Sequence, residues 1–320
     1  MSKNNNTIHI ACAVDEAFSY PLAVLLVSCF ENNKDNKIKI HLFSASLSKT
    51  TVKKFSQISN RYNQEFEFYE LKDEAFKDLP VTNRISQAAY YRILIPENID
   101  NSVDKYLYLD ADMIVTGKLE PLFRINLNNK ILAAVNDVAA IDMEYYKKHN
   151  IPDEFMYFNS GVLLVDKNNW LRTNAGARVL HYRKENNDIC DFLDQDGLNG
   201  ALYKERLHLP PKWNQQVGLF YVDDKVAEKA YPDGDINEAK NNPGIVHFNG
   251  GEKPWNKVSA HPYKNQFKNY ARMVKEFEYS EKTDIKKLIK RHIIYRFFGW
   301  SRVNRYYYLK TKPQDNNGLT

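Results

Sequence analysis

The chain has 320 residues and lacks the features that define several large classes of protein. It contains only three cysteines, Cys12, Cys29 and Cys190, which lie far apart in apolar or helical surroundings. An odd number of widely spaced cysteines argues against a disulfide framework or a metal cluster, so we expect buried free thiols in a reducing cytosol. The longest apolar run, Tyr20–Phe30, is shorter than the ~20 residues of a membrane-spanning helix. Residues 1–6 are polar and precede a predicted strand, so we expect no secretory signal.

Acidic residues are scarce in one stretch near the C-terminus. Residues 284–312 contain nine Lys or Arg residues and one acidic residue, a balance of +8. Because the whole chain carries +5, the other residues carry −3. We therefore expect two parts, a main domain of residues 1–280 and a short basic, aromatic segment of residues 281–320.

The first part of the chain alternates between predicted strands and helices. Alternating or continuous apolar residues predict strands at 7–14, 37–44, 66–71 and 105–109. Helices are predicted at 20–32, at 47–62 with Ser48 as the N-cap, and at 85–96, where a proline is expected to end the helix. This alternation predicts an α/β fold with a mainly parallel sheet and helices on both faces. After residue 130 we expect short strands at 131–137, 160–166 and 244–249, a helix at 194–203 and a surface loop at 231–244.

Two acidic residues, Asp110 and Asp112, separate two apolar segments in "KYLYLDADMIVTGKLEPLF". Ionised acids are costly to bury, yet a parallel sheet binds its ligands beyond the carboxyl ends of its strands. The pair can supply oxygen ligands to a divalent cation that clamps a diphosphate, or it can simply cap the strand. The spacing alone does not decide, because D-x-D also occurs at Asp194/Asp196 and, in a turn-like stretch, at Asp233/Asp235.

Five motifs occur in an order and spacing that resemble glycosyltransferase family 8. They are AAYYRILIP, YLDADMIV, FNSGVLLVDKNNW, DQDGLNG and HFNGGEKPW, and the resemblance extends from Ile8 to Trp255. It is most evident with the bacterial lipopolysaccharide galactosyl- and glucosyltransferases. The resemblance implies a GT-A, Rossmann-like fold, a UDP-sugar donor, Mn²⁺ (with Mg²⁺ as a substitute) and retention of anomeric configuration. The implied activity moves galactose or glucose to a hydroxyl of a surface glycan or lipopolysaccharide-type acceptor.

The resemblance implies that Asp110, Asp112 and His247 bind the metal. Two carboxylates and an imidazole suit Mn²⁺, which accepts mixed oxygen and nitrogen ligands. In the same motif as His247, Gly250 lets backbone amides approach phosphate, and Lys253 supplies a positive charge. A single histidine before a glycine-rich turn is otherwise more often structural.

Further residues are assigned to the donor by the same resemblance. Arg92 is expected to reach the donor sugar and the diphosphate, and Asp137 and Asn159 to bind sugar hydroxyls. Taken alone, Arg92 reads as a surface charge and the other two as turn residues. Asp15 is expected near the uracil, although it can also cap the following helix.

Three small or aromatic positions complete the expected donor site, namely Ala13, Phe18 and Ala111. The chain departs from the common family pattern at Ala17 and Phe18, where Asn and Tyr are usual. Phe18 keeps a face for stacking on a base but loses the hydroxyl, and Ala17 cannot form a hydrogen bond to the donor.

The DQDGLNG motif carries the expected catalytic residues. Two carboxylates around an amide are also compatible with a glycosidase that uses an acid and a nucleophile. In the family, however, Gln195 lies nearest the anomeric carbon, and an amide is a poor nucleophile. We therefore expect front-face attack, with Gln195 stabilising positive charge on the sugar ring and Asp194 as the alternative covalent nucleophile.

Three other functions are weighed. A sugar-nucleotide pyrophosphorylase normally has a glycine-rich loop after its first strand, and "AVDEAFSYPLA" contains no glycine. A nucleic-acid-binding protein would use the basic segment, whose aromatic and aliphatic residues it explains less well. A catalytically inactive glycan-binding relative is disfavoured by the intact set of Asp110, Asp112, His247 and Lys253.

The basic segment mixes Lys and Arg with Ile, Phe, Trp and Tyr. Basic side chains attract anionic headgroups, and aromatic side chains favour the membrane interface. We expect this segment to attach the protein peripherally to the cytoplasmic face of the membrane, near a glycolipid acceptor, without nucleic acid as a partner. The alternative is a C-terminal helix that packs on the core.

Overall fold

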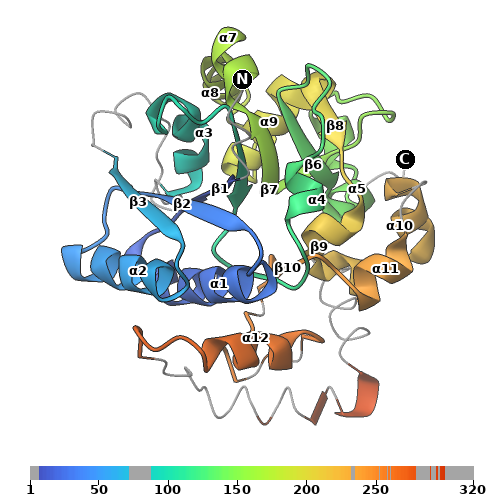
Figure 1. The fold of residues 1–320 in the computed structure, drawn as a ribbon. Coiled ribbons are helices and arrows are strands. Elements are labelled where there is room, and N and C mark those ends of the chain that lie inside the picture. The colour runs from blue at the N-terminus through green and yellow to red at the C-terminus, as the bar shows by residue number, and fades with distance from the viewer. Residues whose placement is uncertain are drawn as a thin grey trace, which may run out of the picture.

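The computed structural model of the chain describes residues 7–71, 88–231, 235–251, 253–257, 259, 261–278, 289, 293–294 and 296–299. Its strands form a seven-stranded sheet and a three-stranded sheet (Figure 1). They are β1 (Thr7–Ala13), β2 (Lys37–Ser44), β3 (Glu65–Glu70), β4 (Lys105–Leu109), β5 (Met113–Val115), β6 (Leu132–Asn136), β7 (Phe158–Asp166), β8 (Arg206–His208), β9 (Gln215–Gln216) and β10 (Ile245–His247). The large sheet has the order β3-β2-β1-β4-β7-β6-β8, and the small sheet has the order β5-β10-β9. In the large sheet only β7 is antiparallel to its neighbours, so the expected mainly parallel sheet is confirmed.

Helices cover both faces of the large sheet. The α-helices are α1 (Ser19–Asn32), α2 (Lys49–Arg61), α3 (Ala88–Asn98), α4 (Glu120–Phe123), α5 (Val138–Asp142), α6 (Tyr145–Lys148), α7 (Lys167–Arg172), α8 (Ala175–Glu185), α9 (Leu193–Leu202), α10 (Asp224–Ala230), α11 (Ile236–Asn241) and α12 (Lys264–Ala271). The 3-10 helices are η1 (Glu16–Phe18), η3 (Tyr203–Glu205), η4 (Pro211–Asn214) and η5 (Val217–Phe220). α1 and α2 pack together, and α12 lies against α1 on the same side of the molecule (Figure 1). α3, α7, α8 and α9 pack against one another and form another layer.

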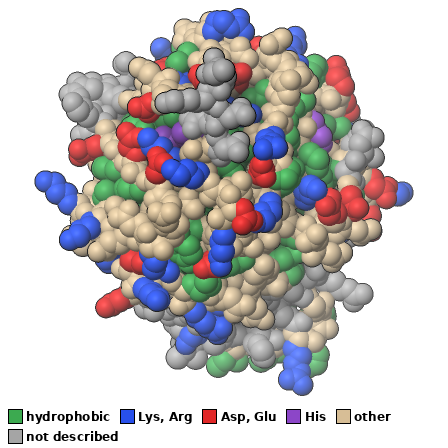
Figure 2. All heavy atoms as spheres, viewed as in Figure 1, with side chains coloured by type: hydrophobic (Ala, Val, Ile, Leu, Met, Phe, Trp, Pro, Cys, Tyr) green, Lys and Arg blue, Asp and Glu red, His purple; other side chains and the backbone are tan. Residues whose placement is uncertain are grey.

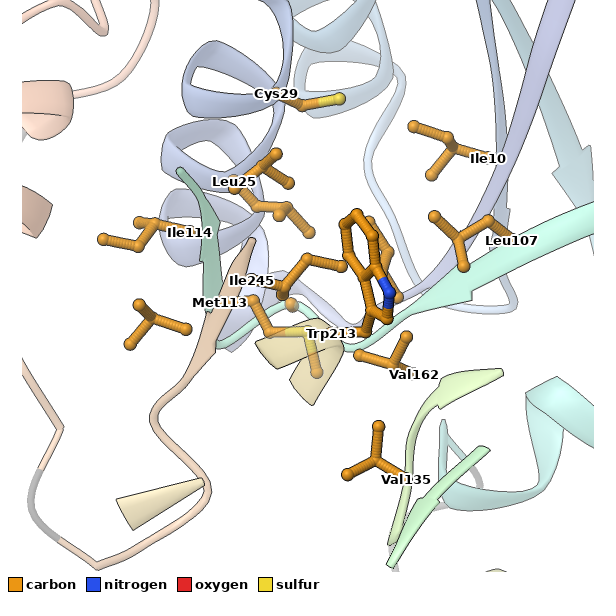
Figure 3. Packing of buried hydrophobic residues seen from close by; sticks show 14 of the residues in the cluster. Ile10, Leu25, Cys29, Leu107, Met113, Ile114, Val135, Val162, Trp213 and Ile245 are labelled. Atoms are coloured by element: carbon orange, nitrogen blue, oxygen red, sulfur yellow. The ribbon is translucent and has the colours of Figure 1, made fainter. Parts of the chain in front are cut away.

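Two hydrophobic clusters separate these layers, because successive residues of a strand point to opposite faces. Ile8, Ile10 and Cys12 of β1 belong to the cluster that contains the buried side of α1. Ala11 of β1 belongs to the second cluster, with residues of α3, α8 and α9. Figure 3 shows Trp213 inserted among the side chains of the first cluster, near the residues of β5 and β10. The two sheets therefore share one core, which fixes the ends of β4 and β10 relative to each other.

The predicted strands of the first 110 residues agree with the structure. Strands were expected at 7–14, 37–44, 66–71 and 105–109, and β1 to β4 match them to within one residue at each end. The expected N-cap is also present, because the Ser48 side chain accepts a hydrogen bond from the Thr51 amide (3.1 Å). Asp235 of the turn-like D-x-D pair is an N-cap as well, and Asp233 lies outside the described residues.

Two predicted boundaries are wrong. α3 does not end at Pro96 but continues to Asn98, because a proline removes only its own N–H donor and the Ile99 amide still bonds to the Ile95 carbonyl (2.8 Å). The expected surface loop at 231–244 contains the helix α11. Asp235 caps this helix by accepting from the Glu238 amide (2.7 Å), so the D-x-x-E spacing was an overlooked start signal.

Buried free thiols are confirmed at Cys12, Cys29 and Cys190. Burial raises the pKa of each thiol, that of Cys190 to about 11, so these thiols stay protonated and unreactive near neutral pH. On the face shown in Figure 2, basic and acidic side chains are interspersed over the surface. Among the described residues, no helix combines the length and the apolar character that a membrane span requires.

The expected boundary between residues 280 and 281 is not tested. Of the segment 281–320, the structure describes only residues 289, 293–294 and 296–299. Four of these are large hydrophobic residues with exposed fractions above one half, namely Ile289, Ile293, Phe297 and Phe298. The rest of the segment lies outside the described residues.

Candidate active site

The D-x-D pair lies where the chain leaves the large sheet for the small one. β4 ends at Leu109, and β5 begins at Met113 and pairs antiparallel with β10, with Met113 opposite His247. The Phe248 amide donates to the Asp112 carbonyl (2.9 Å), which extends this pairing. Two segments that lie far apart in the sequence are thereby held side by side, and His247 comes next to both acids.

Asp110, Asp112 and His247 form a cluster of metal-ligand type. Each offers one ligand atom, and these atoms lie within 4.8 Å of one another. His247 Nε2 is 3.3 Å from Asp112 Oδ1 and 3.9 Å from Asp110 Oδ2. The other ring nitrogen, Nδ1, is 2.9 Å from Asn214 Oδ1, so it carries the proton and leaves Nε2 as a lone-pair donor toward the carboxylates. The residues present therefore fit a divalent cation such as Mn²⁺.

Lys253 neutralises the buried acid of this cluster. Its Nζ donates to Asp112 Oδ2 (2.6 Å) and to the Phe248 carbonyl (2.7 Å). Burial alone would raise the pKa of Asp112, but His247 and Lys253 together hold it well below its usual range. Asp112 is therefore ionised despite an exposed fraction of only 9%. The ion pair with Lys253 explains how an ionised acid can lie between two apolar strands.

Arg92 connects the metal cluster to the expected catalytic residues. From α3, its Nη2 lies 2.9 Å from Asp110 Oδ1 and its Nε lies 2.8 Å from Asp194 Oδ2. Its Nη1 donates to the Ser160 carbonyl (2.7 Å) and hydroxyl (2.8 Å). The guanidinium also stacks over the Tyr108 ring at 4.7 Å. With 10% of its side chain exposed, Arg92 is not the surface charge that the helix pattern alone suggested.

Asp194 and Gln195 project from the first turn of α9. Burial, and secondarily the negative charge of Asp110, raise the pKa of Asp194 to about 6, while Arg92 opposes this shift. The Gln195 amide is fixed at both ends, since its Oε1 accepts from the Ser160 amide (2.9 Å) and its Nε2 donates to Asp137 Oδ2 (3.2 Å). The two side chains thus have different environments although they are neighbours in the sequence.

Asp196, the second acid of this motif, faces away from the site. It is fully buried, and its Oδ1 accepts from the Tyr157 hydroxyl (2.5 Å) and lies 2.9 Å from His149 Nε2. Its Oδ2 accepts from the amide of Phe192, the residue before α9 (2.6 Å), so this bond fixes the first turn of the helix. Asp196 therefore holds the turn that presents Asp194 and Gln195, and a glycosidase pair formed by the two acids does not fit.

Asp137 and Asn159 meet beside Gln195. The Asp137 side chain caps α5 by accepting from the Ala140 amide (3.0 Å), as its turn reading predicts, and it also accepts from Asn159 Nδ2 (3.0 Å). Asn159 lies within β7, so the alternative prediction that it is a turn residue is wrong. Its Oδ1 accepts from Asn214 Nδ2 (2.9 Å), which continues the hydrogen-bond chain from His247 to Gln195.

One cavity of about 440 Å³ collects most of the predicted site residues. Its lining includes Asp110, Asp112, Asp137, Asn159, Asp194, Gln195, His247 and Gly250. Arg92 and Lys253 lie behind these lining residues. Arg92 contacts the carboxylates of Asp110 and Asp194, and Lys253 contacts that of Asp112. Ser160, Asn214 and Tyr221 were not predicted as site residues. Ser160 belongs to the FNSGVLLVDKNNW motif, whereas no sequence pattern marks Asn214 or Tyr221.

Besides Arg92 and Lys253, four expected donor-binding residues do not line this cavity. Asp15 accepts from the Phe18 amide (3.1 Å) and caps η1, so its alternative role is confirmed. Phe18 is 38% exposed, and its ring is perpendicular to that of Trp255, with 6.0 Å between the ring centroids. Ala13 ends β1, and Ala111 is buried between the two acids. β1 and β4 are adjacent and parallel, so these residues lie at the same edge of the sheet as the cavity.

Gly161 is required by the close approach of β7 to the metal cluster. A Cβ at this position would lie 2.4 Å from His247 Cε1 and 2.9 Å from Asp110 Oδ2. The Asp110 amide also donates to the Gly161 carbonyl (2.9 Å). Only glycine lets the strand approach this closely.

Comparisons with known proteins agree with this geometry. Residues 9–259 match the model of glycosyl transferase family 8. General stress protein A of Bacillus subtilis is 30% identical over 273 residues, which are 84% of this chain and 94% of that protein. A lipopolysaccharide 1,2-glucosyltransferase of Escherichia coli is 27% identical over 292 residues, 86% of this chain and 84% of that protein.

Among solved structures, the galactosyltransferase LgtC in complex with donor and acceptor sugar analogs superposes with a TM-score of 0.74. The sequences are 24% identical, and the match covers 85% of this chain and 98% of that one. The expected GT-A fold is thereby confirmed. The comparisons support a glycosyltransferase rather than a sugar-nucleotide pyrophosphorylase or a nucleic-acid-binding protein.

Proposed function

The chain belongs to glycosyl transferase family 8, and we propose that it is a Mn²⁺-dependent, retaining hexosyltransferase with a UDP-sugar donor. The sugar is galactose or glucose, and the acceptor is a hydroxyl of a surface glycan or lipopolysaccharide-type glycolipid. The names of relatives support this proposal, since they include lipopolysaccharide glucosyl- and galactosyltransferases. Mg²⁺ is the expected substitute for Mn²⁺.

The observation that carries the proposal is the placement of the Asp110, Asp112 and His247 cluster in the same cavity as Gln195. A metal-ligand cluster beside a buried polar wall suits a substrate with a diphosphate at one end and a sugar at the other. When bound, the metal would neutralise the charge of the diphosphate as it leaves. Gly250 lines the cavity and leaves room for backbone amides to approach a phosphate oxygen.

The other side of the cavity is built to hold a sugar. Asp137 and Asn159 present oxygen and nitrogen atoms that suit sugar hydroxyls. Gln195 is held by Ser160 and Asp137, so its amide dipole is fixed before the substrate arrives. We assign to Gln195 the stabilisation of positive charge on the sugar ring during transfer.

In this reaction, the bond from the anomeric carbon to the diphosphate breaks and a bond to the acceptor oxygen forms on the same face. The departing phosphate oxygen takes the proton of the acceptor hydroxyl. The route therefore needs no protein base, and configuration is retained. Asp194 is the alternative nucleophile, but its Oδ2 lies against Arg92 Nε, which favours a positioning role.

Ala13, Asp15, Phe18 and Ala111 are assigned to the nucleotide end of the donor. They lie at the carboxyl-end edge of β1 and β4, where parallel sheets bind nucleotides. Ala17 and Phe18 lack the polar groups usual there, so base stacking by Phe18 replaces hydrogen bonding. The exposed fraction of Phe18 is compatible with that role.

Residues 281–320 are proposed as a segment for peripheral attachment to the cytoplasmic face of the membrane, following a catalytic domain of residues 1–280. The exposed Ile289, Ile293, Phe297 and Phe298 support this assignment, together with the excess of basic residues. Such attachment would bring the cavity close to a glycolipid acceptor.

The proposed function is tested with a panel of nucleotide sugars and purified protein. Free nucleotide released by slow hydrolysis is measured with Mn²⁺ and with EDTA. We expect release from UDP-galactose or UDP-glucose with Mn²⁺ and none with EDTA. Release from no nucleotide sugar, or full release in EDTA, would contradict the proposal.

A further inference from the structure

A second cavity lies on the other side of β6 from the active-site cavity. Its volume is about 460 Å³, within the ~300–1,000 Å³ typical of small-molecule sites. Its walls come from the end of β6, from β8, from the end of α10 and from residues 153–156. The two cavities share no lining residue, although Asn136 of this one is the sequence neighbour of Asp137 in the other. Figure 1 shows β8 beside β6 at the edge of the large sheet, near α10.

Arg206 is the central charged residue of this cavity. Its Nη1 donates to Asn136 Oδ1 (2.6 Å), and its Nη2 donates to the Phe155 carbonyl. The guanidinium also lies over the Phe158 ring at 5.4 Å. All of these partners are neutral, and within the described part of the chain Arg206 forms no ion pair with an acidic residue. Arg206 is half-buried, and this burial lowers its pKa to about 10.

Among the described residues, the other polar side chains of the wall supply no counter-ion to Arg206. His208 Nδ1 is 3.5 Å from Arg206 Nη1, and Lys229 adds a second cation. The acids Asp153 and Glu154 also line the cavity, but both are exposed at the rim, and Asp153 already lies 3.4 Å from Lys229 Nζ. A half-buried cation whose partners are all neutral is stabilised by an anion that enters from outside.

The rest of the wall suits a compact molecule with hydroxyl groups. Phe155, Met156 and Pro210 provide an apolar side, and the rim carboxylates can accept hydrogen bonds from hydroxyls. Met156 has a φ of 54°, which is costly for a bulky residue. Such strain is typical of functional sites, where the surrounding structure maintains it. The strained residue directly follows Phe155, whose carbonyl accepts from Arg206.

We propose that this cavity is a second binding site, separate from the donor site, for a small sugar that carries a carboxylate or a phosphate group. The anionic group pairs with Arg206, the ring packs against Phe155 and Met156, and its hydroxyls face Asp153 and Glu154. Asn136 ends β6, and the next residue, Asp137, caps α5 and lines the active-site cavity. A ligand bound at Arg206 and Asn136 therefore lies one residue away from the donor-binding wall.

The test is isothermal titration calorimetry of the full chain in EDTA, so that metal-dependent binding at the donor site is excluded. The probes are D-glucuronate, glucose 6-phosphate and the neutral control glucose. We expect at least one of the anionic sugars to bind more tightly than glucose, and whichever binds identifies the anionic group. Arg206→Gln should weaken that binding about tenfold or more, the loss expected for one charge-assisted contact. Arg172→Gln, an equal change of charge at an exposed residue of α7, should leave it unchanged.

A second measurement does not depend on the folding of a variant. Phenylglyoxal modifies accessible arginines, and peptide mass spectrometry reports each site. The bound sugar should protect Arg206 of the unaltered protein and leave Arg172 reactive. Absence of binding by both anionic sugars, binding that Arg206→Gln does not weaken, or a sugar that fails to protect Arg206 would each overturn the proposal.

Discussion

The close contact of Gly161 with the metal cluster gives a sharp prediction for Gly161→Ala. The added methyl group would lie 2.4 Å from His247 Cε1 and 2.9 Å from Asp110 Oδ2, far inside van der Waals contact. His247 is itself held by Asn214, and Asp110 by Arg92 and Tyr108, so neither side chain can withdraw without losing a partner. The strain must therefore displace a metal ligand or the strand β7.

The magnitude follows from these contacts. Overpacking of a rigid site costs about 1–3 kcal/mol, which lowers the melting temperature by a few degrees. Displacement of a ligand by about 1 Å is expected to reduce turnover about 100-fold. We therefore expect a folded protein with weakened Mn²⁺ binding and little nucleotide release.

Three measurements check this prediction, namely thermal unfolding by circular dichroism, Mn²⁺ titration calorimetry and nucleotide release from the donor. The matched control is Gly176→Ala in α8, where the nearest atom to the added methyl group is 3.4 Å away. This variant should keep both activities, and its stability should not fall, since alanine favours a helix. If Gly161→Ala bound Mn²⁺ and released nucleotide as the unaltered protein does, the geometry described for the cluster would be wrong.

Three further predictions concern catalysis, acid stability and the C-terminal segment. Gln195→Ala should slow turnover by about two to three orders of magnitude without abolishing it, whereas a dead Asp194→Asn and a glycosylated enzyme in mass spectrometry would identify Asp194 as the nucleophile. Burial, aided by the positive charges of His9 and Lys39, lowers the pKa of His41 to about 3, so between pH 6.5 and 3 only the unfolded chain binds this proton. As the pH is lowered through this window, the free energy of unfolding should thus fall by about 1.4 kcal/mol per pH unit. In denaturant titrations His41→Gln should reduce that slope, whereas a change at the exposed His181 should not. A chain ending at Glu281 should fold, release nucleotide and lose binding to anionic liposomes; failure to fold, or no liposome binding by the full chain at low salt, would make the segment structural.

The parts of the fold that depend on local pattern could be predicted from the sequence. The alternation in residues 37–44 and the cap at Ser48 each determine their own local structure, and both are as expected. The antiparallel direction of β7 could not be predicted, because an apolar run does not record which neighbour its strand pairs with. The three-stranded sheet was missed for a similar reason, since β5 and β9 have only three and two residues.

The candidate site shows the same division. Asp110 and Asp112 were found because a strong strand pattern leads directly to them, whereas His247, far along the chain, was assigned through the resemblance. The role of Arg92 as a bridge between Asp110 and Asp194 depends on how α3 packs on the sheet, and no local pattern encodes that. Asn214 orients His247 from a 3-10 helix, and a single asparagine carries no signal in a sequence.

The central claim is that Asp110, Asp112 and His247 bind the metal on which transfer depends. The most direct measurement is calorimetric titration of Mn²⁺, in the presence of UDP, into the unaltered protein and into Asp110→Asn, Asp112→Asn and His247→Ala. The account predicts one Mn²⁺ per chain for the unaltered protein, with binding and nucleotide release both lost in each variant, because each change removes a ligand. Folded variants that still bind Mn²⁺ like the unaltered protein would contradict it.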